Sequence, residues 1–114
     1  MNKNFIWLTV FIFSTLAPPI FASSQTGKVK WISIREGGLI HFGLDTNRDV
    51  SGTCAENNPH YWVIKDENSN SGSHQLSSLL AAQTAKMTVE IVGAGTCTRI
   101  SDAEDVNEVK IHAN

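Results

Sequence analysis

The residues best suited to chemistry in this 114-residue chain are its large aromatic side chains. After the N-terminal apolar segment they include Trp31, Tyr61 and Trp62. The C–H faces of sugars stack on exposed aromatic rings, but the same rings also fill the cores of small barrels. Adjacent residues of a strand point to opposite faces, so we expect one of Tyr61 and Trp62 to lie in the core. Trp62 is the favoured core residue of the two. The other ring, and Trp31, are candidates for a ligand-binding surface.

The sequence carries no pattern typical of a catalytic or metal site. The histidines, His41, His60, His74 and His112, lack the spacing of paired metal ligands. Residues 45–49 resemble a calcium loop only loosely, because they lack the glycine and the bidentate glutamate. There is also no nucleophile elbow, phosphate-binding glycine loop or carboxylate pair that could share a pocket. We therefore expect no enzyme activity, no metal and no cofactor.

The N-terminal segment has the pattern of a secretory signal peptide. Lys3 precedes an apolar run over residues 5–13, residues 14–19 break that run, and the small residues Ala22, Ser23 and Ser24 follow. The apolar run is shorter than the roughly 20 residues of a membrane-spanning helix. We predict cleavage after Ala22, with an uncleaved anchor as the alternative. Residues 1–22 are then the signal peptide, and residues 23–114 form one domain that is secreted or periplasmic.

The two cysteines of the chain, Cys54 and Cys97, both follow the signal peptide. An even number of cysteines in an exported domain favours a disulfide, and a domain this small benefits from such a crosslink. Two free thiols are the alternative. A zinc site would need further ligands at suitable spacing, which the sequence lacks.

The charge of the chain limits its partners. The formal net charge is −2, and removal of Lys3 with the signal peptide lowers it to about −3. This sign disfavours a nucleic-acid groove, which acts by neutralising phosphates. After the signal peptide no segment is long and apolar enough to span a membrane.

Residue periodicity predicts five strands and one helix. Runs of β-branched and aromatic residues, bounded by turn residues, indicate the strands. Ser73 is a candidate N-cap for a helix over 75–86, in which Leu76, Leu79 and Leu80 form an apolar stripe. Residues 99–105 form a polar acidic loop before the last strand. The predicted strands cover residues 28–34, 39–44, 61–64, 87–92 and 109–111.

This order predicts the fold class. Three strands, a helix and two further strands fit the five-stranded Greek-key barrel of the OB type, with the helix between strands three and four. We expect a mainly β domain whose leucine stripe, Leu80 included, is buried against the barrel.

Several segments resemble the receptor-binding B subunits of Shiga-type bacterial toxins. Residues 26–29 (TGKV) open the first strand as in that family, and residues 79–91 (LLAAQTAKMTVEI) are similar to its helix and fourth strand. Cys97 falls near the second family cysteine, and residues 108–111 (EVKI) are similar to its last strand. The matched segments cover about half of the domain.

The resemblance implies a ring of five OB subunits that binds host cell-surface glycans or glycolipids and carries a separate catalytic A subunit, a virulence function. In such rings the helices line a central pore and edge strands of neighbours pair. The predicted helix suits this role, since Lys86 is the only charged residue between Gln75 and Met87. We expect a homopentamer that presents several identical glycan sites, which raises avidity.

The chain also departs from the family at positions that matter for binding. The first family cysteine has no counterpart in residues 23–25, so Cys97 is expected to pair with Cys54 in an inserted loop. An acidic run in the first hairpin is reduced to Glu36, and a family tryptophan before the helix corresponds to Ser73. The alternative is therefore an OB-fold structural or interaction protein of the periplasm or envelope without a toxin partner. The candidate glycan contacts are Trp31, Glu36, Tyr61 and Trp62.

Overall fold

The computed structural model describes residues 9, 10, 12 and 21–114. Most of the predicted signal peptide therefore lies outside the described residues. Within the described part of the chain, no helix has the length and apolar character needed to cross a bilayer.

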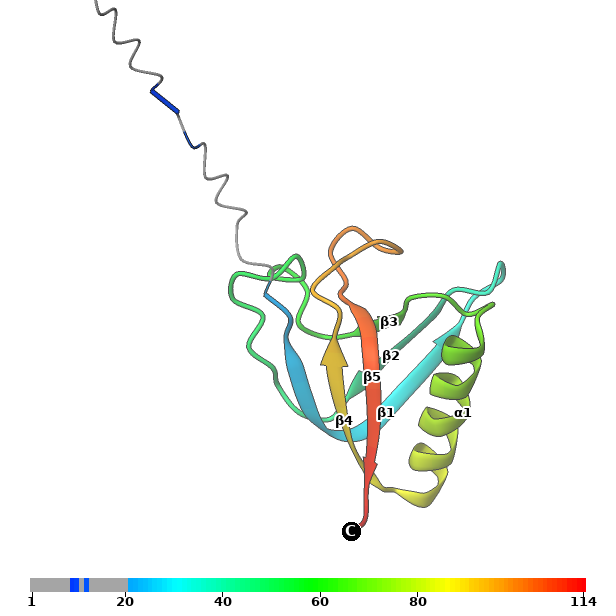
Figure 1. The fold of residues 1–114 in the computed structure, drawn as a ribbon. Helices are drawn as coiled ribbons and strands as arrows, with labels where there is room; N and C mark the ends of the chain where they lie inside the picture. The colour runs from blue at the N-terminus through cyan, green and yellow to red at the C-terminus, as the bar shows by residue number, and fades with distance from the viewer. Residues whose placement is uncertain (1–8, 11, 13–20) are drawn as a thin grey trace, which may run out of the picture.

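Five strands close into a barrel in the order β1-β2-β3-β5-β4 (Figure 1). Neighbouring strands are antiparallel except β3 and β5, which run parallel. One helix, α1, connects β3 to β4. This confirms the predicted OB-type barrel with its helix between strands three and four. The elements are β1 Ser24–Ile34, β2 Ile40–Leu44, β3 Trp62–Ile64, α1 Asn70–Ala85, β4 Thr88–Gly93 and β5 Asp105–His112.

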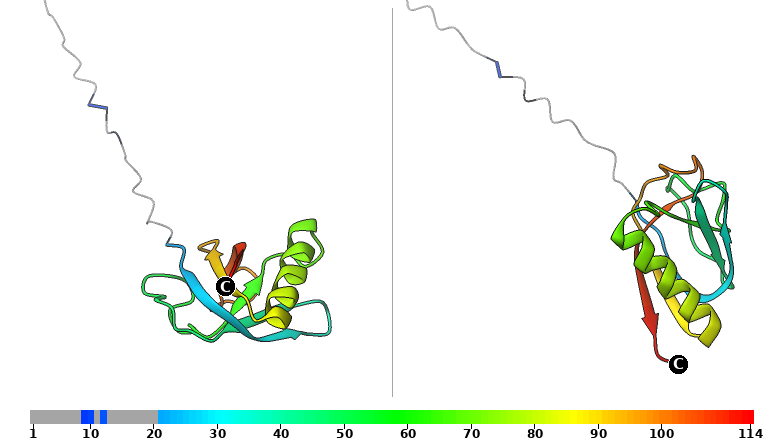
Figure 2. Two further views of the ribbon diagram at one scale, coloured as in Figure 1. Left: turned by 90° about the horizontal axis from the view of Figure 1, so that it is seen from below. Right: turned by 90° about the vertical axis from the view of Figure 1, so that its right-hand side faces the viewer.

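The first strand is the longest, and it bends to pair with two partners. Its first half pairs with β4, from Ser24 to Lys28, and its second half pairs with β2. A β-bulge interrupts the β2 pairing between Val29 and Trp31, and bulges of this kind bend a strand and increase its twist. Figure 2 shows the curved course of β1 around the barrel. The sequence placed the start of this strand four residues too late, because Gly27 and the polar residues before it weaken the strand pattern.

The helix begins earlier than predicted. Its N-cap is Ser69, whose hydroxyl accepts a hydrogen bond from the backbone N–H of Gly72 at 3.0 Å. The predicted cap Ser73 is wrong, since it lies inside the first turns of the helix. Gly72 allows the first turn to approach the preceding loop, because a Cβ there would lie 1.8 Å from the carbonyl oxygen of Asp66. Residues 70–73 are weak helix formers, and they are helical because of this cap and close packing.

The apolar stripe of α1 is shifted from its predicted position. Leu79 and Ala82 are fully buried against the barrel and Leu76 is partly buried. Leu80 is 44% exposed, so its predicted burial is wrong. The buried face follows Gly72, Leu79 and Ala82, which puts Leu80 about 100° around the helix from the centre of the contact.

The C-terminal strand is longer than predicted, and its first residues are polar. Residues 99–104 form a loop as predicted, but Asp105 already belongs to β5, and Glu104 and Asp105 are completely buried. The Oδ2 atom of Asp105 accepts hydrogen bonds from the hydroxyl groups of Thr96 and Thr98 and from the N–H of Thr98. The β4–β5 loop thus supplies partners for the Oδ2 atom, whereas the buried Oδ1 atom has no hydrogen-bond partner among the described residues.

The predicted disulfide between Cys54 and Cys97 is confirmed. It joins the long β2–β3 loop, residues 45–61, to the β4–β5 loop, residues 94–104, across 43 positions of sequence. In the chain-entropy model a loop of this length stabilises the fold by about 4 kcal/mol. A disulfide of this kind fits an extracellular or periplasmic compartment.

Candidate functional site

Three aromatic rings from different elements meet on the outer face of the barrel. Trp31 of β1 lies 5.2 Å from His41 of β2 and 6.2 Å from Tyr61, which precedes β3, between ring centroids. His41 and Tyr61 lie 5.4 Å apart, and all three pairs are edge-to-face. Such geometry is the favoured one for aromatic pairs. We call this group, Trp31, His41 and Tyr61, the aromatic cluster.

The bulge in β1 and a glycine in β2 place Trp31 in the cluster. Val29 and Ile32 both face the core, so the two residues between them, Lys30 and Trp31, both lie on the outer side of the strand. The indole packs directly on Gly43, where an added Cβ would lie 2.4 Å from the Trp31 Nε1 atom. Any side chain at this position of β2 would displace the ring.

His41 contributes a neutral ring to the aromatic cluster. Burial, assisted by the charge of Arg35, lowers the pKa of His41 below its ordinary value of 6.5. The ring is therefore uncharged at neutral pH, and its Nδ1 atom is buried without a hydrogen-bond partner among the described residues. An uncharged, tightly packed imidazole extends the aromatic surface of its two neighbours.

A pocket of about 400 Å³ adjoins the aromatic cluster. The two meet at His60, whose carbonyl oxygen lies beside the Trp31 indole above Gly43. The volume lies within the range typical of small-molecule sites. Cationic side chains outnumber acidic ones in its lining, with Lys30 and Arg48 against Asp45. The lining residues are Lys30, Leu44, Asp45, Thr46, Asn47, Arg48, Pro59 and His60.

Arg48 connects the lining of this pocket to the core. Its guanidinium lies 3.8 Å above the ring of Trp62, and its Nη2 atom donates to the carbonyl oxygen of Tyr61 at 3.1 Å. Burial lowers the pKa of Arg48 to about 10, and the charge of Glu104 acts weakly in the opposite direction. The side chain remains charged at neutral pH and holds the backbone of Tyr61 beneath the aromatic cluster.

The predicted glycan contacts do not all lie together. Trp31 and Tyr61 are neighbours in the aromatic cluster, and both are half-buried. Glu36 is exposed in the β1–β2 turn and forms no hydrogen bond or ion pair with the cluster within the described ranges. Trp62 is completely buried, and its Nε1–H donates to Gln25 Oε1 at 2.8 Å. It is a core residue with no ring surface on which a ligand could stack.

Sequence reasoning missed His41 and Arg48. The alternation of residues 39–44 predicts that His41 shares a face with Gly43, but the sequence does not reveal which outer residue of β1 lies opposite. Arg48 lies in a polar loop that has no periodicity, so no local signal marks it as buried.

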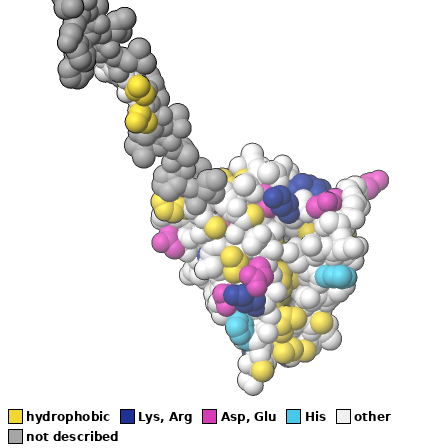
Figure 3. All heavy atoms as spheres, in the orientation of Figure 1, with side chains coloured by type: hydrophobic (Ala, Val, Ile, Leu, Met, Phe, Trp, Pro, Cys, Tyr) yellow, Lys and Arg dark blue, Asp and Glu magenta, His cyan; other side chains and the backbone are white. Residues whose placement is uncertain are grey.

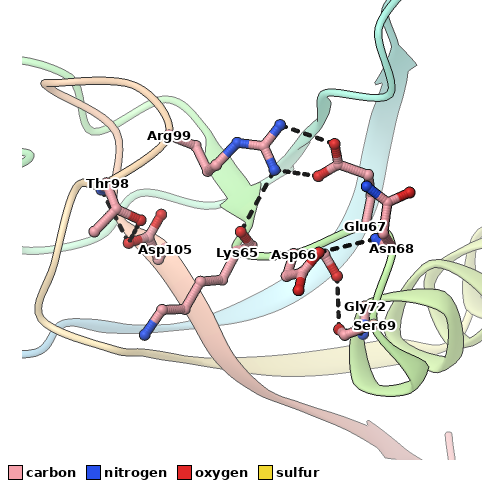
Figure 4. A network of polar contacts seen from close by, with 9 residues as sticks. All are labelled: Lys65, Asp66, Glu67, Asn68, Ser69, Gly72, Thr98, Arg99 and Asp105. Atoms are coloured by element: carbon pink, nitrogen blue, oxygen red, sulfur yellow. Dashed lines mark hydrogen bonds and ion pairs between the residues drawn. The ribbon is translucent and has the colours of Figure 1, made fainter.

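A second group of polar residues fastens the β3–α1 loop to the β4–β5 loop (Figure 4). Arg99 forms a two-pronged ion pair with Glu67 and donates to the carbonyl oxygen of Lys65 at 3.5 Å. The ion pair lowers the pKa of Glu67 and raises that of Arg99. The side chains of Arg99 and Glu67 are 29% and 10% exposed, and their ion pair holds the two loops together.

The fold and the site define a class of protein: a small OB-type barrel with one inter-loop disulfide and a cluster of aromatic rings on its outer face. Across residues 21–114 and the three described residues before them, no cluster of His, Cys, Asp and Glu is suited to hold a metal ion. The chain matches no family model, no curated protein and no solved structure at a significant level.

Proposed function

We propose that this chain is a secreted, non-catalytic, glycan-binding subunit of the Shiga-toxin B type. The observation that carries this proposal is the aromatic cluster beside the 400 Å³ pocket, on the outer face of β1, β2 and β3. OB folds commonly bind oligosaccharides and oligonucleotides on the face formed by their second and third strands. The negative net charge and the predicted signal peptide favour the sugar over the nucleic acid.

The cluster and the pocket have complementary roles in this proposal. The half-buried rings of Trp31 and Tyr61 offer an apolar surface for the C–H face of one sugar ring. The pocket offers hydrogen-bonding groups at Asn47 and His60 for a neighbouring sugar. Lys30 has no carboxylate within ion-pair distance among the described residues, so the pocket favours an acidic substituent such as a carboxylate.

Features of the opposite surfaces support an oligomer. The helix α1 contains no Asp, Glu, Lys or Arg in its 16 residues. Leu80 on α1 and Ile111 on β5 are both at least 40% exposed, and Figure 3 shows hydrophobic side chains gathered around the lower half of α1. β3 pairs with only the first two residues of β5. The carbonyl oxygen of the next residue, Asn107, accepts from Gln75 of α1, and no described strand pairs with this edge beyond it. These features suit a ring in which helices face one another and β5 pairs with the next copy, with a separate A subunit docked on it.

A glycan array with the disulfide-bonded chain of residues 23–114 tests the binding proposal. We expect selective binding of acidic glycans and at least a tenfold loss in Trp31→Ala and in Lys30→Ala. Lys65→Ala is the matched control, because Lys65 is exposed and lines only the separate pocket beside α1. Absence of binding to every glycan, or equal loss in the control, would contradict the proposal.

Light scattering at micromolar concentration tests the assembly. We expect five copies per particle and a smaller particle for Leu80→Glu, which puts a charge on the contact between helices. A stable monomer that binds no glycan would support the alternative, an OB-fold interaction protein of the periplasm or envelope.

A further inference from the structure

The side chain of Glu104 is completely buried. Its oxygens accept hydrogen bonds from the backbone nitrogen of Ser23, at 3.1 and 3.4 Å, and from the N–H of Gly95, at 3.2 Å. The hydroxyl of Ser23 also donates to Glu104. Residue 93 must be glycine for this arrangement, since a Cβ there would lie 1.6 Å from the Glu104 Oε2 atom.

Nothing in the described part of the chain neutralises this carboxylate by direct contact. No nitrogen of Lys, Arg or His lies within 4.0 Å of Glu104 in that part of the chain. Arg48 interacts with it only at longer range and is itself buried. Neutral N–H and hydroxyl donors alone solvate this carboxylate, and a cationic donor makes a stronger hydrogen bond to a carboxylate than a neutral one does.

Ser23 is the residue that becomes the amino terminus if the predicted signal peptide is cleaved after Ala22. Hydrolysis of the Ala22–Ser23 peptide bond consumes one water molecule, leaves a carboxylate on Ala22 and turns the amide nitrogen of Ser23 into an ammonium group. We propose that Glu104 is a built-in receptor for this new amino terminus, so that proteolytic processing at Ser23 creates a buried ion pair that completes the fold.

The surrounding structure holds Ser23 in the required position. The residue is 7% exposed, whereas Phe21 and Ala22 before it are exposed. The carbonyl oxygen of Ser23 accepts from the N–H of Gly93 at 2.8 Å, and the next residue, Ser24, pairs with Val92. Figure 1 shows the start of β1 beside the end of β4 and the β4–β5 loop. The nitrogen therefore stays on Glu104 when the preceding residues are removed.

A chain one residue longer provides a matched comparison. A form that starts at Ala22 has the same net charge and also ends in an ammonium group, but that group lies one residue away from Glu104. Both forms are prepared with a protease that leaves no extra residue, and each is also made with Glu104→Gln. We expect the Ser23 form to melt at least about 5 °C higher than the Ala22 form. The difference should largely vanish in the Glu104→Gln pair, because the amide carries no charge.

The difference in stability between the Ser23 form and the Ala22 form should depend on pH in a defined direction. The carboxylate raises the pKa of the folded amino group above its ordinary value of about 7.7–8.0. The extra stability of the Ser23 form is then fully present at pH values below the ordinary pKa of the amino group. It is lost as the pH rises through the higher pKa of the folded state. From the β4–β5 loop Glu104 faces the amino group, from the β2–β3 loop Arg48 acts at longer range, and the paired residues of β4, Val92 and Gly93, are uncharged.

A second measurement keeps the proposal testable if Glu104→Gln does not fold. Acylation of the terminal amine at neutral pH, followed by mass spectrometry, should be at least about tenfold slower in the Ser23 form than in the Ala22 form. Equal melting temperatures, equal acylation rates, or a difference that persists in Glu104→Gln would overturn the receptor role.

Mass spectrometry of the exported full chain tests the cleavage point separately, and a mature terminus other than Ser23 would also overturn the proposal. Neither measurement depends on glycan binding.

Discussion

The barrel is covered by α1 on one side and by the β2–β3 loop on the other, and the two sides are built from different chemistry (Figure 1). On the helix side, Leu79 and Ala82 pack against apolar residues of the core. On the loop side, three polar side chains are buried, those of Gln25, Arg48 and Glu104. Gln25 donates to the carbonyl oxygen of Thr46, Arg48 donates to that of Tyr61, and Glu104 accepts from the N–H of Gly95. The disulfide holds only the loop side.

This difference has a physical consequence. Apolar packing is non-directional and tolerates small shifts, so the helix side needs no covalent support. Buried polar groups lose much of their stabilisation when one partner moves, because each unpaired group then pays its full desolvation cost. The loop side therefore depends on features that fix the backbone, namely the Cys54–Cys97 bond and the paired start of β1.

The largest effect should come from removing the covalent support of the loop side. We expect Cys54→Ser combined with Cys97→Ser to lower the free energy of unfolding by about 4 kcal/mol in denaturant titrations. Hydrogen exchange of the backbone should accelerate in the β2–β3 loop more than in α1. Uniform acceleration on both sides would refute the proposed difference between them.

A cavity on the helix side should cost almost as much. Leu79→Ala removes a fully buried side chain and should lower the free energy of unfolding by about 2–5 kcal/mol. Leu80→Ala is the control on the same turn of the helix, and its exposed side chain should change stability by less than about 1 kcal/mol at concentrations where the protein is dissociated. Similar losses in both variants would mean that the helix is rotated from the described position.

The hydrogen bond between Trp62 and Gln25 distinguishes the two tryptophans. Trp62→Phe leaves the buried Oε1 atom of Gln25 without its donor and should cost about 1–3 kcal/mol, measured by denaturant unfolding. Trp31→Phe keeps an aromatic ring on the outer face and should leave stability within about 1 kcal/mol of the parent. If Trp31→Phe is the more destabilising change, the assignment of core and surface is wrong.

The smallest effect concerns the start of α1. Ser69→Ala removes the N-cap and should lower the free energy of unfolding by about 1 kcal/mol. Ser73→Ala, inside the helix, should be neutral or slightly stabilising, since alanine is the better helix former. Thermal melts of both variants decide whether the helix starts at Asn70 or nearer Gln75.

Much of the fold could be predicted because its signals are local. The alternation of Val89 and Ile91 with polar neighbours marks β4, and Gly37 and Gly38, both with positive φ, mark the hairpin between β1 and β2. The start of α1 could not be predicted in the same way. By local sequence alone, Ser69 and Ser73 are equally suitable as the N-cap of α1. Only the close approach of Gly72 to Asp66 favours Ser69.

The candidate site was predictable in part. Trp31 and Tyr61 are suited by residue type alone to a ligand face, and the adjacent Trp62 must then point the other way. His41 joins them only through the pairing of β2 with both of its neighbours, and the bulge that turns Trp31 outward leaves no periodic signal.

By itself, the sequence determined the barrel class, the order of its elements and the disulfide. The barrel class and the order of its elements follow from the alternation of apolar and polar residues in the strands and from the helical spacing of apolar residues, both of which are visible in short segments. The disulfide follows from the presence of only two cysteines. Only the tertiary structure decided that Glu104 lies on the nitrogen of Ser23, 81 positions away, and that Arg48 lies over Trp62. Contacts between polar residues far apart in the chain have no periodicity to reveal them, because they form only when closure of the barrel brings the loops together.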